Sequence, residues 1–167
     1  MTRSDARVAL ATEAWRAILD FISATAGERT RLLADIGLTV NDSRALTALD
    51  AERGRSMSSL AEDWSCDAST ATWIVNRLER KGFVERRAHP SDRRLRLAAL
   101  TPAGLAMRDE MLGRLYAAPP ELLALDPPDL VALRDGATKL RRALPTRSGR
   151  PSSQAAAENV RRSHPER

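Results

Sequence analysis

Apolar residues recur at steps of three and four along most of the chain, which is the pattern of amphipathic helices. The first such segment spans about Asp5 to Ala26, and Gly27 is expected to end it. A shorter segment, 28–36, follows and stops at Gly37. The sequence Thr39-Val-Asn-Asp42 has the form of a capping box and predicts the start of another helix. The first part of the chain is therefore expected to be helical.

Two short helices with a tight turn between them are predicted in the middle of the chain. Ser56 can cap the first, over 57–64, and a break at 65–67 leads into the second, over 68–81. Gly82 follows directly and suits the left-handed position that ends many helices. Helices of this length joined by such a turn predict a helix-turn-helix.

The period of the pattern changes to two after Gly82. Residues 83–87 and 95–100 alternate as strands do, and the segment 88–92 between them is rich in turn-forming residues. The chain therefore predicts a β-hairpin immediately after the second helix, in the position of a wing.

The C-terminal part returns to helical spacing. Thr101-Pro102 predicts a helix start with proline in the first turn, and a further helix is expected over 129–144. The fold class expected is mainly α with a small β-hairpin wing. Its divisions are N-terminal dimerisation helices (1–37), a winged helix-turn-helix (38–101), C-terminal dimerisation helices (102–144) and a disordered basic tail (145–167).

Positive charge is concentrated in one stretch of the predicted winged domain. Residues 76–96 hold eight basic and three acidic side chains, a balance of +5, which equals the formal net charge of the whole chain. A basic stripe of this kind is typical of a nucleic-acid-binding face, with a solvated charged surface as the alternative. The arginines of the tail are expected to be inert or to assist binding weakly.

Several classes of protein are not expected. The first ten residues lack the apolar core of a signal peptide, no apolar run approaches the roughly 20 residues of a membrane span, and Cys66 is the only cysteine. We therefore expect a cytoplasmic protein without a membrane partner. The only histidines are His89 and His164, and no phosphate loop, dinucleotide fingerprint or zinc-spaced cluster is present. We expect no catalysis, cofactor or metal.

Five segments, read in order, resemble the winged helix-turn-helix of the MarR (multiple antibiotic resistance regulator) family. They are Met57-Ser-Ser-Leu-Ala-Glu62, Asp67-Ala-Ser-Thr-Ala-Thr72, Val75-Asn-Arg-Leu-Glu-Arg-Lys-Gly-Phe-Val-Glu-Arg-Arg87, His89-Pro-Ser-Asp-Arg-Arg94 and Leu97-Ala-Ala-Leu-Thr-Pro-Ala-Gly104. The resemblance implies a homodimeric transcriptional regulator, expected to be a repressor, that binds pseudo-palindromic double-stranded DNA. It also implies release by a small aromatic or phenolic effector. A winged-helix module that binds protein or RNA is the alternative.

The resemblance also implies a set of DNA-binding residues, with the second helix lying in the major groove and the wing reaching the minor groove. Trp73 departs from the family, which usually has a polar or basic residue there, so its ring is expected either to contact a thymine methyl or sugar or to pack against the wing. Asp92 is expected to stabilise the wing by holding its arginine side chains through charge-assisted hydrogen bonds. The predicted DNA contacts are Ser69, Thr70, Thr72, Trp73, Arg77, Arg86, Arg93 and Arg94, with Arg93 inserted in the minor groove and Arg87 as a further phosphate contact.

The remaining predictions concern the dimer and the effector. The apolar faces of the terminal helices are assigned to the partner subunit, and a ligand pocket is expected between these helices and the winged domain. Cys66 is expected to be an inert residue of the turn rather than a redox sensor. The dimer residues are Val8, Ile18, Ile22, Leu130, Leu133 and Leu140, and the pocket candidates, each with plain core packing as the alternative, are Trp15, Leu46 and Met107.

Overall fold

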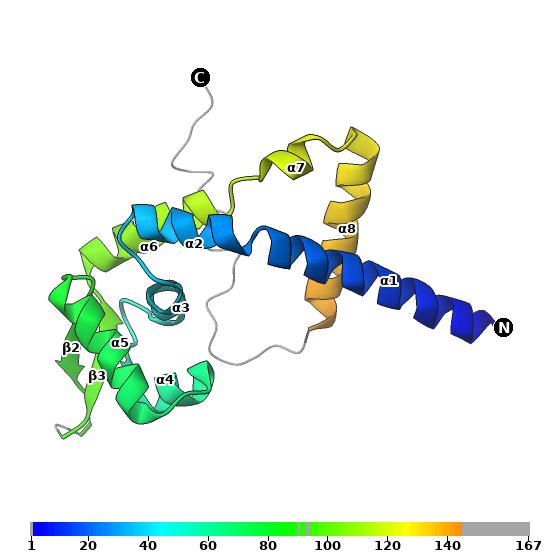
Figure 1. Cartoon of the computed structure of the whole chain (residues 1–167). Coiled ribbons are helices and arrows are strands. Elements are labelled where there is room, and N and C mark those ends of the chain that lie inside the picture. The colour runs from blue at the N-terminus through cyan, green and yellow to red at the C-terminus, as the bar shows by residue number, and fades with distance from the viewer. Residues whose placement is uncertain (1, 90, 93, 145–167) are drawn as a thin grey trace.

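The computed structural model describes residues 2–89, 91–92 and 94–144 (Figure 1). Within these residues the chain is mainly helical and carries one small antiparallel sheet of strand order β1-β3-β2, which confirms the predicted fold class. The predictions for Arg93 and for the tail lie outside the described residues. The helices are α1 (Arg3–Ala24), α2 (Ala26–Asp35), α3 (Val40–Ala48), α4 (Met57–Trp64), α5 (Ala68–Arg80), α6 (Pro102–Leu115), α7 (Pro120–Leu123) and α8 (Pro127–Ala143), and the strands are β1 (Arg55–Ser56), β2 (Val84–Ala88) and β3 (Arg96–Leu100).

Local side-chain caps set the helix starts that the sequence predicts. At the start of α3, the Asp42 amide donates to Thr39 Oγ1 at 3.2 Å and the Thr39 amide donates to Asp42 Oδ2 at 2.9 Å, which completes the capping box. Ser56 caps α4 and Thr101 caps α6 without a capping box, each by accepting from the amide three residues ahead. Gly82 has φ +76°, the left-handed conformation expected after α5.

The predicted end of the first helix is wrong. α1 ends at Ala24, and Gly27 lies inside α2. The Arg29 guanidinium donates to Thr25 Oγ1 and to the Ile22 carbonyl, each at 2.8 Å. The last carbonyls of a helix need such partners, and here side chains provide them, so the break forms without a glycine.

The hairpin and the core agree with the predicted pattern. β2 and β3 pair from Val84–Leu100 to Ala88–Arg96, so the hairpin begins on the core and runs outward as a wing. β1, which the sequence pattern did not reveal because it has two residues, pairs with β3. The largest fully buried apolar side chains are Leu46, Leu49, Leu60, Leu78, Leu100 and Met111.

The terminal helices lie outside this core. No described residue of α1, α7 or α8 is buried, whereas α2 to α6, the sheet and the segments between them supply the buried cluster. α1 extends away from the winged body in Figure 1. In the part of the chain that the structure describes, no helix has both the length and the apolar character needed to cross a membrane.

Candidate nucleic-acid interface

One face of α5 is fixed in the core and the opposite face is exposed. Ala71, Ile74, Val75 and Leu78 are buried, and their spacing places them on a single side of the helix. Because this side packs against α3 and α4, the other side is left for a partner. We call that side the exposed stripe; its residues are Ser69, Trp73, Asn76 and Arg80.

The hydroxyl groups predicted to contact DNA are engaged at the start of α5. Ser69 Oγ and Thr70 Oγ1 donate to the Asp67 carboxylate, the second at 2.8 Å, and Thr72 Oγ1 donates to the Ala68 carbonyl at 2.7 Å. A hydroxyl whose proton is used in this way retains its acceptor lone pairs. In this conformation these three side chains can accept from base amino groups, and donation to a phosphate requires the hydroxyl to rotate.

Asp67 is held in its charged form by the same contacts. The hydrogen bond from the Ser69 hydroxyl, followed by those from the Thr70 amide and hydroxyl, holds the pKa of the Asp67 carboxyl well below its ordinary value. Asp67 is also the N-cap of α5, so its charge lies at the positive end of the helix dipole.

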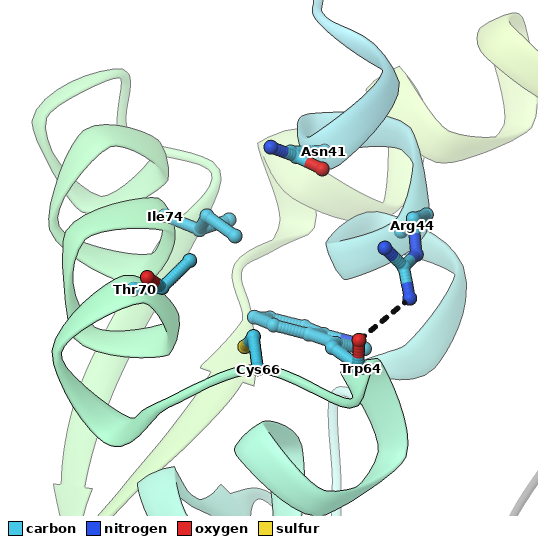
Figure 2. A pocket seen from close by; sticks show the side chains of 6 residues that line it. All are labelled: Asn41, Arg44, Trp64, Cys66, Thr70 and Ile74. Atoms are coloured by element: carbon cyan, nitrogen blue, oxygen red, sulfur yellow. Dashed lines mark hydrogen bonds between the residues drawn. The ribbon is translucent and has the colours of Figure 1, made fainter.

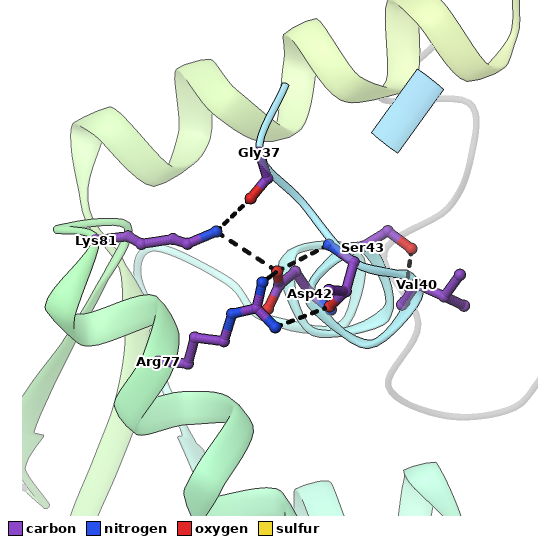
Figure 3. A network of polar contacts seen from close by, with 7 residues as sticks. Gly37, Val40, Asp42, Ser43, Arg77 and Lys81 are labelled. Carbon is purple, nitrogen blue, oxygen red and sulfur yellow. Dashed lines mark hydrogen bonds and ion pairs between the residues drawn. The ribbon is translucent and has the colours of Figure 1, made fainter. Parts of the chain in front are cut away.

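Arg77 is directed toward the body of the protein rather than toward solvent (Figure 3). Its Nη2 lies 3.1 Å from Asp42 Oδ2, and its Nη1 donates to Thr39 Oγ1 at 3.5 Å. Lys81 Nζ lies 3.6 Å from the same Asp42 oxygen and donates to the Gly37 carbonyl. The Asp42 side chain is only 1% exposed, so two cations of α5 and its C-terminal end neutralise a buried carboxylate at the start of α3.

This placement bears on the predicted DNA contact of Arg77. The Asp42 carboxylate is buried, and Arg77 both pairs with it and donates to Thr39 Oγ1, so moving Arg77 to a base would give up both contacts. We therefore expect Arg77 to stay on Asp42. The guanidinium also lies over the Trp73 ring, with Cζ 5.8 Å from the ring centroid.

The base of the wing is tied to α5 through Arg86. Its Nη1 donates to Glu79 Oε2 at 2.7 Å and its Nη2 donates to Asn76 Oδ1 at 2.5 Å. Arg87 pairs with Glu85 and donates to the Ala51 carbonyl at 2.7 Å. Both side chains predicted as phosphate contacts therefore also brace the hairpin.

The tip of the wing presents Arg94 and Arg96 as exposed residues. Asp92 Oδ1 accepts from the Arg94 amide at 2.9 Å, and the Asp92 carbonyl accepts from the Leu95 amide at 3.1 Å. The sequence predicts that Asp92 holds arginine side chains, whereas these two bonds fix the turn through backbone groups.

The three candidates for a ligand pocket occupy different environments. Leu46 is fully buried in α3, Met107 of α6 packs against the same core, and Trp15 of α1 is 58% exposed and is not part of that core cluster. A small pocket of the described chain lies elsewhere, beside the turn between α4 and α5, where Cys66 is half-buried (Figure 2). Its lining residues are Asn41, Arg44, Trp64, Cys66, Thr70 and Ile74.

Three residues of this interface were not identified from the sequence. Asn76 could have been found, since it lies on the exposed stripe one turn after Trp73. Asp67 could have been recognised as the N-cap of α5 from its place before the helix. The pairing of Asp42 with Arg77 carried no local signal, because the two residues are far apart in the sequence and meet only when α3 packs on α5.

The winged helix-turn-helix of this chain matches a known family model. Residues 38–95 match the model of the MarR family. The chain carries a MarR family winged helix-turn-helix. MarR family proteins are DNA-binding transcriptional regulators, and the matched segment of this chain supports that general role.

Solved structures share the fold over most of their length. The transcriptional regulator BldR from Sulfolobus solfataricus is 26% identical with a TM-score of 0.55, and the match covers 86% of this chain and 100% of BldR. A point mutant of MepR from S. aureus is 18% identical with a TM-score of 0.64, over 80% of this chain and 98% of MepR. Another MepR mutant, bound to an oligodeoxyribonucleotide, is 19% identical with a TM-score of 0.54, over 78% of this chain and 98% of that chain. No curated protein matches the sequence.

Proposed function

We propose that this protein is a homodimeric, cytoplasmic repressor that binds a pseudo-palindromic DNA operator. α5 of each subunit lies in the major groove and the wing lies along the neighbouring backbone and minor groove. The observation that carries the proposal is the exposed stripe of α5, which displays polar groups and Trp73 while the opposite face of the helix is buried. The MepR structure with a bound oligodeoxyribonucleotide supports the same use of the fold.

The dimer is supported by the terminal helices. Val8, Trp15 and Leu140 are each more than half exposed, although α1 and α8 are otherwise well-formed helices. Apolar side chains at helical spacing that are left out of the subunit core are expected to pack against a partner. A second copy of the chain, related by two-fold symmetry, would bury them and place two α5 helices on one face of the DNA.

Release by a small aromatic or phenolic effector completes the proposal. Displacement of the protein from DNA by members of a panel of small phenols, with an equal concentration of the matching cyclohexanols as control, would test this part. Unchanged DNA binding across the panel would remove effector release from the proposal and leave DNA binding intact.

The test of the main proposal is a fluorescence-anisotropy titration at two salt concentrations. The probe is the duplex that the native chain enriches from a random library, and the competitor is the same duplex with its sequence scrambled. Arg94→Ala on the wing is expected to weaken binding about five- to tenfold and to reduce its salt dependence, because a phosphate contact is lost. The control is Arg142→Ala on α8, at an exposed residue two positions after Leu140 and therefore on roughly the opposite side of that helix.

Two results would contradict the proposal. Equal affinity for the enriched and scrambled duplexes would show that the exposed stripe does not read sequence. Enrichment of no DNA, with stable binding to RNA or to a protein, would favour the interaction-module alternative.

A further inference from the structure

Trp73 is a large aromatic residue that lies exposed on the surface of α5. Its side chain is 53% exposed, in the middle of the exposed stripe of α5, where the proposed function places the floor of the major groove. A large apolar ring in this position loses contact with water only when a partner covers it. Covering the ring on DNA therefore favours an apolar feature of the partner surface over a polar one.

The major groove offers one apolar feature among its base edges. Guanine, adenine and cytosine present hydrogen-bond donors and acceptors there, whereas thymine adds a C5-methyl group. The indole carries a single donor, Nε1–H, and no acceptor, so most of its surface matches a methyl group better than it matches a polar edge.

The Trp73 ring is in contact with Arg77, which is itself held by Asp42. The Arg77 guanidinium lies over the ring with Cζ 5.8 Å from its centroid. The same guanidinium is 3.1 Å from Asp42 Oδ2, and this ion pair is drawn in Figure 3. Asp42 is in turn fixed by the capping box with Thr39. A chain of contacts thus runs from the start of α3 to the ring, and it limits the rotamers available to Arg77 and Trp73.

We propose that Trp73 reads the C5-methyl group of a thymine in each half-site, and that Arg77 and Asp42 act as positioning residues that hold its ring. The inference rests on the proposed function, since it assigns a specificity to the same helix. Arg77 contributes through Trp73 and Asp42 and does not contact a base.

Replacement of thymine by deoxyuridine tests this inference, because it removes the C5-methyl group and leaves every hydrogen-bonding edge unchanged. The probe is the enriched duplex, with each thymine replaced in turn. The native chain is expected to bind about three- to fivefold more weakly when one particular thymine of a half-site is replaced, because the burial of one methyl group is lost. Arg142→Ala, on the side of α8 opposite Leu140, should keep both the affinity and this ratio.

The ratio of thymine to deoxyuridine affinity in variants of Trp73, Arg77 and Asp42 decides whether the ring reads the methyl group. Trp73→Ala is expected to bind the thymine and deoxyuridine duplexes equally, and Trp73→Phe should restore part of the ratio. Asp42→Asn and Arg77→Lys, at temperatures where circular dichroism shows them folded, should reduce the ratio toward one. A residue with only a structural role would weaken binding to both duplexes by the same factor and leave the ratio unchanged.

The outcomes separate the inference from the proposed function. Sequence-selective binding with a thymine-to-deoxyuridine ratio of one at every position overturns the reading of a methyl group by Trp73. A native ratio that Trp73→Ala leaves intact overturns it as well, and a ratio unchanged in both Asp42→Asn and Arg77→Lys overturns their positioning role. Failure to enrich any duplex overturns the proposed function itself and the inference with it.

Discussion

Gly104 lies directly against the backbone carbonyl of Phe83. A Cβ atom placed on Gly104 would be 1.9 Å from the Phe83 oxygen, far inside van der Waals contact. The same carbonyl accepts from the Thr101 amide at 3.1 Å, and Thr101 Oγ1 accepts from the Gly104 amide at 3.0 Å. α6 therefore begins packed on the first residues of the wing, and this contact explains the Leu-Thr-x-x-Gly pattern that ends the family resemblance.

Replacement of Gly104 by alanine should destabilise the fold. Because the obstacle is a backbone carbonyl that cannot rotate away, α6 and the wing must separate, at a cost of about 1–3 kcal/mol. Urea denaturation measures the change. Gly113→Ala on the same helix is the matched control, since nothing lies within 4 Å of its added Cβ. That variant should gain up to about 1 kcal/mol from helix propensity. Equal urea midpoints for Gly104→Ala and Gly113→Ala would contradict the close contact of Gly104 with the Phe83 carbonyl.

Asp42 is expected to matter more for stability than a surface carboxylate does. Asp42→Ala leaves Arg77 and Lys81 without their shared buried partner and removes the N3 residue of the capping box, so a loss of about 3 kcal/mol is expected. Asp135→Ala breaks an exposed pair with Arg134, at side chains 52% and 69% exposed, and should cost about 0–1 kcal/mol. Denaturant unfolding at neutral pH measures both. Similar losses in the two variants would show that the Asp42 network does not stabilise the fold.

Acid should weaken the start of α5 through Asp67. Its pKa is lowered in the folded state, first by the Ser69 hydroxyl, so its contribution to stability is present above the ordinary aspartate pKa of about 4 and is lost as the pH falls below it. Asp67→Asn keeps an oxygen for capping and removes the charge. The difference in denaturation midpoint between the native chain and Asp67→Asn should be largest near pH 7 and should shrink below pH 4. A difference in denaturation midpoint that does not change with pH would show that the charge of Asp67 does not contribute to stability.

The apolar side chains of α8 should control the oligomeric state. Leu140 is 62% exposed in the single subunit, and a charge at this position is incompatible with an apolar interface. Light scattering after size exclusion should give about twice the chain mass of 18.3 kDa for the native protein and a shift toward the single-chain mass for Leu140→Glu. Arg142→Glu, two residues further and so on roughly the opposite side of the same helix, should remain dimeric. A native monomer would contradict the proposed dimer.

The elements of this fold that depend on neighbours in sequence were predictable. Thr39, Ser56 and Thr101 each cap a helix through a residue three positions ahead, and Gly82 supplies the left-handed conformation after α5. Such signals lie within one turn of the chain, so the sequence displays them directly.

Contacts between distant segments were not predictable. The ion pair of Arg77 with Asp42 joins α5 to α3, so no local pattern predicts it. The end of α1 is missed for a different reason, although its contacts are local. Glycine ends many helices, which favours Gly27, whereas here the Arg29 guanidinium binds Thr25 Oγ1 and the Ile22 carbonyl in an arrangement that no common capping pattern describes.

The measurement that tests the account most directly is the dependence of DNA affinity on the distance between the two half-sites. Two α5 helices held by one dimer should enter successive major grooves about 34–36 Å apart. Inserting about five base pairs between the half-sites, roughly half a helical turn, moves one of them to the opposite face of the DNA, and affinity should fall to that for a single half-site. The same insertion outside the half-sites should have no effect. Affinity that is insensitive to the internal insertion would show that the protein does not read DNA as a rigid two-fold dimer.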